Sequence, residues 1–81
     1  MVIAREEEEN LKRTATIYEK MDSRSGSRIL VAMCADGRQD DAAKLLYYMS
    51  DRSAGKMLAD MTDAKLAASL SERLKKIRQG S

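Results

Sequence analysis

The chain contains no proline, histidine, tryptophan or phenylalanine, and it has one cysteine among its 81 residues. Because proline is the strongest breaker of helix interiors, its absence leaves every segment free to be helical. Without histidine, neither a Ser–His nor a Cys–His pair can form, which excludes the usual nucleophilic hydrolases. A lone cysteine without histidine makes neither an internal disulfide nor a zinc site. We therefore expect Cys34 to be a buried, inert thiol, and we predict no enzyme activity, no cofactor and no metal.

The chain also lacks a large excess of charge of either sign, since it has 15 basic and 13 acidic residues and a formal net charge of +2. This balance gives little attraction for DNA or an anionic membrane, so no nucleic-acid partner is expected. No apolar run approaches the ~18 residues of a membrane-spanning helix, so membrane attachment is expected only through a segment not present here. A basic cluster near the end is interpreted as the last turn of a helix, with weak phosphate contact as the alternative. It comprises Arg73, Lys75, Lys76 and Arg78.

What is present is a sequence rich in helix-forming residues, with 43% hydrophobic and 35% charged side chains. Residues 2–21 are predicted to form one helix, whose acidic run at residues 6–9 suits the positive end of the helix dipole. Ala4, Leu11 and Tyr18 are spaced seven apart, as in a coiled-coil seam, although Glu7 falls on that seam. Residues 1–16 are therefore interpreted as an N-terminal helix that could end a coiled coil begun upstream.

Short helices of similar sequence follow residue 21, and their leucines mark a repeat. The leucines are spaced 16, 12 and 12 residues apart and are Leu30, Leu46, Leu58 and Leu70. Small residues precede each leucine and would let a neighbouring helix approach closely. These small residues are Gly26 and Ser27, Ala42 and Ala43, Ala54 and Gly55, and Ala67. Stacked units of this length predict an all-α fold over residues 17–79, a compact right-handed superhelix of about four units behind a longer N-terminal helix.

Local signals predict where these helices begin and end. Asp22, Ser50 and Thr62 each follow a methionine and can accept a hydrogen bond from a free first-turn amide. The stretch Asp36-Gly37-Arg38 has the composition of a loop. A last helix is predicted over residues 63–79, with Gly80 as its terminator.

The same spacing predicts the hydrophobic core, because leucine and methionine recur at i, i+3 or i+4 within each unit. The predicted core is Ile17, Met21, Ile29, Leu30, Met33, Ala42, Leu45, Leu46, Met49, Met57, Leu58, Met61, Leu66, Leu70 and Leu74. This assignment treats the methionines as core residues, with an adaptable binding groove as the alternative.

Tyr47 and Tyr48 are adjacent in a predicted helix, so both cannot point into the same core. One of them is expected at a surface or an interface, where tyrosine is favoured, with an ordinary boundary residue as the alternative. The candidate interface residues are Tyr18, Arg38, Asp40, Tyr47, Tyr48 and Arg52.

Residues 49–61 resemble the short-helix repeat of the MgtE transporter N-terminal domain and of the flagellar rotor protein FliG. A unit of that family reads roughly Met-Asp-Pro-Glu-x-Ala-Ala-x-x-Leu-x-x-Met, and here Ala54 and Gly55 stand at its alanine pair. The stretch from Ile17 to Asp22 is similar to the start of the domain in flagellar MotE and spirochaete FlbB proteins. The chain departs from the family pattern because the proline at the first helical position is absent from every unit.

The resemblance implies three functions. The first is a flagellar-motor scaffold or chaperone of the MotE/FlbB type, whose parent protein is periplasmic, anchored in the inner membrane and dimeric through the N-terminal helix. Its module would hold a flagellar stator or collar protein. The second is a cytoplasmic magnesium-sensing domain of an MgtE-type transporter, and the third is a generic helical adaptor. The first is preferred, because the acidic helix runs straight into the first repeat.

Overall fold

Five helices and one pair of two-residue strands make up the computed structural model, which describes residues 2–79. The helices are α1 (Arg5–Glu19), α2 (Ser23–Ala35), α3 (Gln39–Tyr48), α4 (Asp51–Ala59) and α5 (Ala64–Lys75). The strands are β1 (Val2–Ile3) and β2 (Arg78–Gln79), which pair in parallel. The predicted all-α class is confirmed. Within the described part of the chain, no helix is both long and apolar enough to cross a bilayer.

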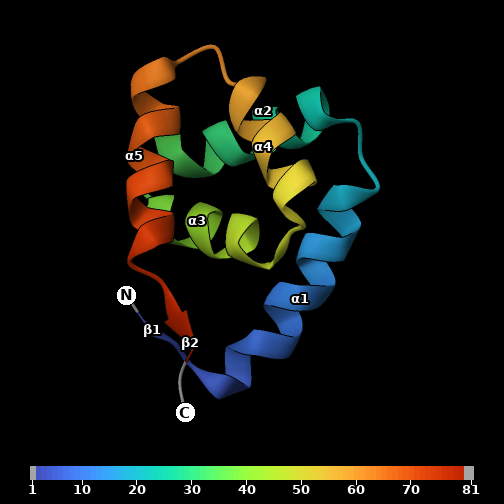
Figure 1. Cartoon of the computed structure of the whole chain (residues 1–81), viewed down its shortest axis with the longest axis vertical. Helices are drawn as coiled ribbons and strands as arrows, with labels where there is room; N and C mark the ends of the chain where they lie inside the picture. The colour runs from blue at the N-terminus through green and yellow to red at the C-terminus, as the bar shows by residue number, and fades with distance from the viewer. Residues whose placement is uncertain (1, 80–81) are drawn as a thin grey trace.

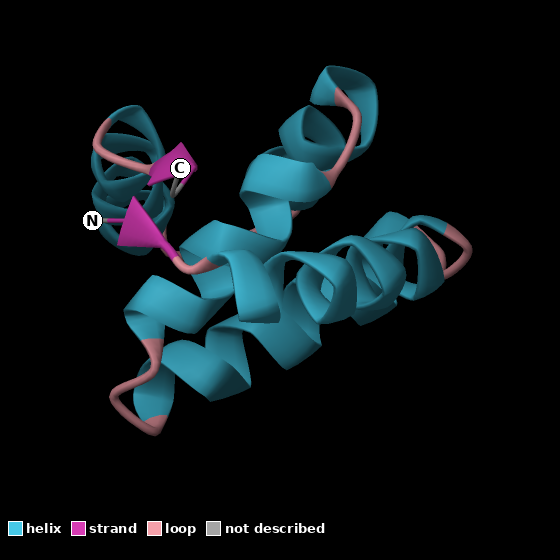
Figure 2. Ribbon diagram, turned by 90° about the horizontal axis from the view of Figure 1, so that it is seen from below, coloured by secondary structure: helices cyan, strands magenta, loops and turns pink. Residues whose placement is uncertain are grey.

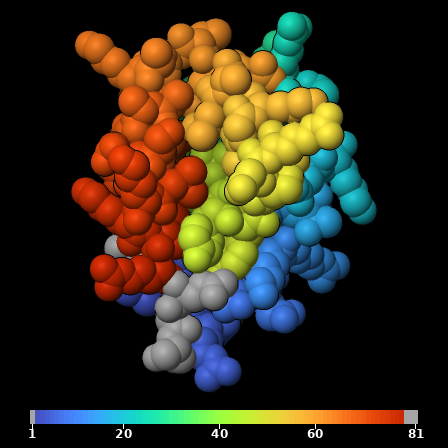
Figure 3. Space-filling view, in the orientation of Figure 1, coloured from blue at the N-terminus to red at the C-terminus, as the bar shows by residue number. Residues whose placement is uncertain are grey.

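Helix α3 lies at the centre of the molecule and packs against α1, α2 and α5. Helix α2 runs behind α4 and packs against it (Figure 1). The space-filling view shows α5 along one side and α1 along the other, with α3 visible between them beneath α4 (Figure 3). The principal dimensions are 35 × 24 × 22 Å.

The helix starts follow local capping chemistry. The Asp22 carboxylate accepts hydrogen bonds from the amides of Arg24 and Ser25, and the Ser50 hydroxyl accepts one from the Ser53 amide. These two predicted caps are confirmed. The third is wrong by one residue, because Asp63 rather than Thr62 caps α5. An aspartate caps at least as well as a threonine, and the residue before it is left in the linker.

The two ends of the chain differ from the sequence expectation. Helix α1 begins at Arg5 instead of residue 2, and α5 ends at Lys75 instead of residue 79. The end segments pair with each other instead, beside the last turn of α5 (Figure 2). Ile3, in β1, and Ile77, just before β2, are buried there, at 0% and 7% exposed. Burying an isoleucine contributes about 1.5–3 kcal/mol, which exceeds the gain from one frayed helical turn. The predicted terminator Gly80 lies outside the described residues.

Most of the predicted core is buried or packed against buried residues, and Cys34 is buried as expected. Three predicted core residues are wrong, since Ile17 is 52% exposed, Ile29 is 39% exposed, and the half-buried Met21 lines a surface hollow instead of packing against the core. Ile17 lies roughly 200° around α1 from the buried Ala15. Ile29 lies roughly 100° around α2 from the fully buried Leu30. Core residues that the periodicity missed are Ile3, Ala15, Ala43 and Ile77.

The small residues of the repeat serve close packing in only part of the chain. A Cβ atom on Gly26 would lie 2.6 Å from Cε of Met57, so the absence of a side chain there lets α4 approach α2. Ala42 and Ala43 are fully buried where α3 meets its neighbours. Gly55 is exposed and a Cβ atom there would meet nothing within 4 Å, so its predicted role is wrong.

The predicted loop after α2 is confirmed. Gly37 adopts a φ of +80°, which glycine reaches without steric cost. Its amide donates to the carbonyl of Cys34, and the Arg38 amide donates to the carbonyl of Met33. This pair of hydrogen bonds closes the C-terminus of α2 as a Schellman motif and turns the chain toward α3.

Candidate functional site

Tyr47 and Tyr48 lie in the last turn of α3, and both are half-buried against the core. Their ring centroids are 5.1 Å apart and the rings are nearly perpendicular, at 84°. The ammonium group of Lys12, on α1, lies 5.9 Å from the centroid of the Tyr48 ring, within reach of a cation–π contact. Both tyrosines therefore lie at the boundary between core and solvent, whereas only one of them was expected at a surface or an interface.

Tyr18 and Arg38 lie close together near the end of α2. The Tyr18 hydroxyl lies 3.9 Å from Sδ of Met33. Burial raises the pKa of Tyr18, and the positive charge of Arg38 partly opposes that rise. Arg38 itself is exposed and forms an ion pair with Asp36 at 3.5 Å.

Asp40 and Arg52 have different surroundings. The Asp40 carboxylate accepts a hydrogen bond of 2.6 Å from the guanidinium of Arg73, which joins the first turn of α3 to α5. Arg52 lies in the first turn of α4 and lines a hollow of about 350 Å³ together with Glu19 and Lys56. Of the six candidate interface residues, the structure brings Tyr47 beside Tyr48 and Tyr18 close to Arg38, whereas Asp40 and Arg52 have other neighbours. The role of these residues as an interface stays a prediction.

Glu19 ties the end of α1 to the start of α4. Its carboxylate accepts a hydrogen bond of 2.9 Å from the Ser50 amide, and this bond is the main cause that lowers the pKa of Glu19. The Ser50 hydroxyl in turn caps α4. The α4 start is therefore fixed by a contact that spans 31 residues of sequence as well as by its own cap.

The predicted coiled-coil seam of α1 packs against the core of its own chain, not against a second helix of a coiled coil. Leu11 and Tyr18 pack against the core, and the Glu7 carboxylate lies 3.3 Å from the ammonium group of Lys44, on α3. Glu7 also accepts a hydrogen bond from the Ala4 amide, and this bond and then Lys44 lower its pKa. The acidic residue that interrupts the seam is thus an intramolecular partner of α3.

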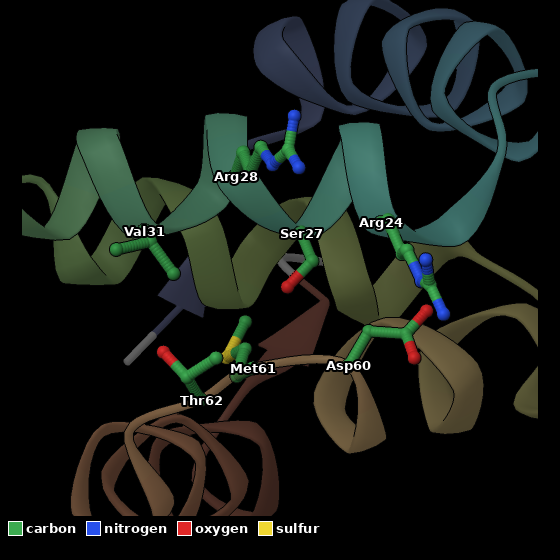
Figure 4. Close-up of a pocket in the computed structure, with 7 residues that line it drawn as sticks. All are labelled: Arg24, Ser27, Arg28, Val31, Asp60, Met61 and Thr62. Carbon is green, nitrogen blue, oxygen red and sulfur yellow. The ribbon is translucent and has the colours of Figure 1, made fainter.

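A cleft that the sequence reading missed lies between α2 and the linker from α4 to α5. Its volume is about 330 Å³. It is lined by Arg24, Ser27, Arg28, Val31, Asp60, Met61 and Thr62 (Figure 4). The signal that could have found it is the spacing of Arg24, Arg28 and Val31, which places them along one side of α2.

Metal ligands and a reactive thiol are two kinds of chemical group that could support a reaction. In the part of the chain that the structure describes, no three His, Cys, Asp or Glu residues cluster as metal ligands would. Burial raises the pKa of the Cys34 thiol, which keeps it protonated and weakly nucleophilic at neutral pH. Across residues 2–79, side chains from different helices contact one another through ion pairs, hydrogen bonds and apolar packing.

Comparison with known proteins finds no family model, no curated protein and no solved structure that matches this chain. No family is assigned on that basis. The resemblance of residues 49–61 to the repeat of the MgtE and FliG proteins stays a prediction.

Proposed function

We propose that this chain is a non-enzymatic protein-interaction domain of a flagellar-motor scaffold or chaperone similar to MotE and FlbB. The observation that carries the proposal is that the repeat motif coincides with two of its three predicted helix caps and with the burial of three of its four leucines. Asp22 and Ser50 cap α2 and α4, and Leu30, Leu46 and Leu70 lie at equivalent motif positions in the core. A motif that matches helix starts and core residues is more than a chance run of similar letters.

The finer architecture belongs to the same proposal. The short helices α2 to α5 would form about four units of a right-handed superhelix, as stacked helical repeats do. The parent protein would dimerise through α1 and its upstream extension. Because Leu11 and Tyr18 pack against the core of this chain, a second copy would meet a different side of α1, where Ile17 is 52% exposed.

In the cell, the parent protein would be anchored in the inner membrane through a segment outside this chain, with this domain in the periplasm. Its partner would be a stator or collar protein of the motor. The exposed arginines Arg38 and Arg52 are the candidate contacts that can be changed without touching the core. They therefore give the cleanest test of the interface.

The test is an in-frame deletion of the region that encodes this chain in the source organism. We expect swimming in soft agar to be lost while flagellar filaments still assemble, because a scaffold for stators acts after the filament is built. Arg38→Glu combined with Arg52→Glu should reduce swimming, whereas Lys65→Glu, which reverses the charge of an exposed lysine on α5, should not. A deletion strain that swims normally contradicts the proposal.

A further inference from the structure

The cleft between α2 and the α4–α5 linker has a closed floor and an apolar wall. Met61 and Ser27 are 7% and 3% exposed and form its inner surface, and Val31 is half-buried beside them. Figure 4 shows Ser27 and Val31 pointing from α2 toward Met61 and Thr62. A volume of about 330 Å³ lies at the lower end of ligand-binding pockets. It suits one large apolar side chain together with the backbone that carries it.

The walls of the cleft are held by contacts outside it. The Ser23 hydroxyl donates a hydrogen bond to the Asp60 carboxylate, which joins the start of α2 to the end of α4. The Met61 amide donates to the Leu58 carbonyl at 3.2 Å, and Asp63 then caps α5. A site that is already formed loses little conformational entropy when it binds.

The mouth of the cleft carries more positive than negative charge. Arg24 and Arg28 are one helical turn apart on α2 and both are exposed. Neither forms an ion pair within 4.0 Å among residues 2–79. Asp60 is the one acid in the lining, and its carboxylate already accepts from Ser23. At one end of the cleft, Arg24 extends toward Asp60 (Figure 4). The lining as a whole therefore favours an anionic partner.

We propose that this cleft receives an apolar side chain of an acidic helical segment of a partner protein. The apolar side chain would lie against Val31 and Met61. Carboxylates one turn away on the partner helix would meet Arg24 and Arg28, since i and i+4 spacing places two charges on one helix face. Arginine suits this role because its planar group can bind a carboxylate through two hydrogen bonds. The inference rests on the proposed function only in that both make this chain a binding domain.

The probe is a fluorescein-labelled helical peptide with one Leu and with Glu residues one turn before and after it. Fluorescence anisotropy should show saturable binding to the wild-type chain. Arg24→Glu or Arg28→Glu should each weaken that binding by roughly tenfold. Thr62→Trp should weaken it by filling the cleft, with its thermal unfolding midpoint checked against wild type. Arg13→Glu carries the same charge change outside the cleft and should leave binding unchanged.

Two altered peptides separate the apolar and the charged parts of the interaction. Replacing Leu by Ser should abolish binding, and replacing the Glu residues by Gln should remove most of its salt dependence. Several outcomes overturn the inference. These are no binding by the first peptide, equal losses with Arg13→Glu and Arg28→Glu, or binding that survives both Thr62→Trp and the Leu-to-Ser change.

Two other occupants would also overturn the inference. Inorganic phosphate that displaces the peptide at millimolar concentration would indicate a simple anion site. Self-association of the chain that is lost with Arg28→Glu would indicate that a second copy fills the cleft, through its exposed Glu6 and Glu9. Peptide binding combined with normal swimming of the deletion strain would leave this inference standing while the flagellar proposal fails. Loss of swimming without peptide binding would leave the flagellar proposal standing while the inference about the cleft fails.

Discussion

Helices α2 and α4 begin with two copies of one motif, but they turn different faces to the core. In α2, Leu30 is fully buried and the preceding Ile29 is 39% exposed. In α4, the residue before the leucine is the buried one, since Met57 is 2% exposed and Leu58 is half-buried. One residue corresponds to roughly 100° of rotation about a helix axis. The motif therefore fixes where these two helices start, whereas packing fixes which face is buried.

The reason for the rotation is the contact between the two helices. Gly26 on α2 has no side chain, and the end of Met57 occupies the space where its Cβ atom would lie. Helix α4 packs chiefly on α2, so this contact decides its orientation. Gly55 of α4 then faces outward, with no neighbour within 4 Å of its Cβ position, whereas Ala54 still packs against the core.

The largest expected effect comes from the two equivalent leucines. Leu30→Ala should lower the free energy of unfolding by about 3 kcal/mol, because it leaves a cavity in the core. Leu58→Ala should lower it by only about 1 kcal/mol, because that side chain keeps part of its contact with water. Urea denaturation of both variants measures the difference. Equal losses would mean that α2 and α4 bury equivalent faces after all.

The two glycines should respond to the same substitution with opposite signs. Gly26→Leu should lower the free energy of unfolding by about 2 kcal/mol, since the new side chain collides with buried Met57. Gly55→Leu should raise it by about 0.5 kcal/mol, because leucine favours a helix more than glycine does and the site is open. Thermal and urea unfolding check both values. A loss at Gly55 would place that residue in a packed interface.

The caps of the two helices offer a smaller test. Ser50→Ala should lower the free energy of unfolding by about 1 kcal/mol, because the Ser53 amide loses its partner at the start of α4. Ser69→Ala, at an exposed site within α5, serves as the matched control and should change stability little. Hydrogen exchange of the α4 amides would localise the effect. A change confined to α5 amides would contradict it.

The smallest effect is the pH dependence of the α2 cap. Hydrogen bonds from the Ser25 hydroxyl and amide lower the pKa of Asp22 below its ordinary 3.8. A lowered folded-state pKa means that the stabilisation is present above pH 3.8 and is lost as pH falls through the folded value. Asp22→Ser should therefore flatten the loss of stability below pH 3.8. Asp51→Ser, in the first turn of α4, is the charge-matched control. If Asp22→Ser loses stability below pH 3.8 as steeply as the wild type, the α2 cap is not the source of that pH dependence.

Local chemistry explains which parts of the fold could be predicted from the sequence. Asp22 and Ser50 cap helices through amides two or three residues away, and Gly37 closes α2 within one turn. Such signals lie within one stretch of sequence. The pairing of β1 with β2 does not, since it brings Ile3 beside residues near the other end of the chain. A helical pattern therefore predicted longer end helices than the structure has.

The candidate surfaces were harder to predict for the same reason. Asp40 looks like a first-turn acid, yet its partner Arg73 lies 33 residues away. Glu7 looks like an interruption of a coiled-coil seam, yet Lys44 lies 37 residues away and pairs with it. The cleft beneath Arg24 depends on where the α4–α5 linker passes α2. These contacts follow from helix packing, which the motif does not specify.

A double-mutant cycle tests most directly whether the Gly26–Met57 contact sets the orientation of α4. Gly26→Leu and Met57→Ala are made singly and together, and the free energy of unfolding is measured for all four chains. We expect a favourable coupling of about 2 kcal/mol, because the new leucine fills the space that Met57 leaves. Effects that simply add would show that the two residues do not meet, and would contradict the account.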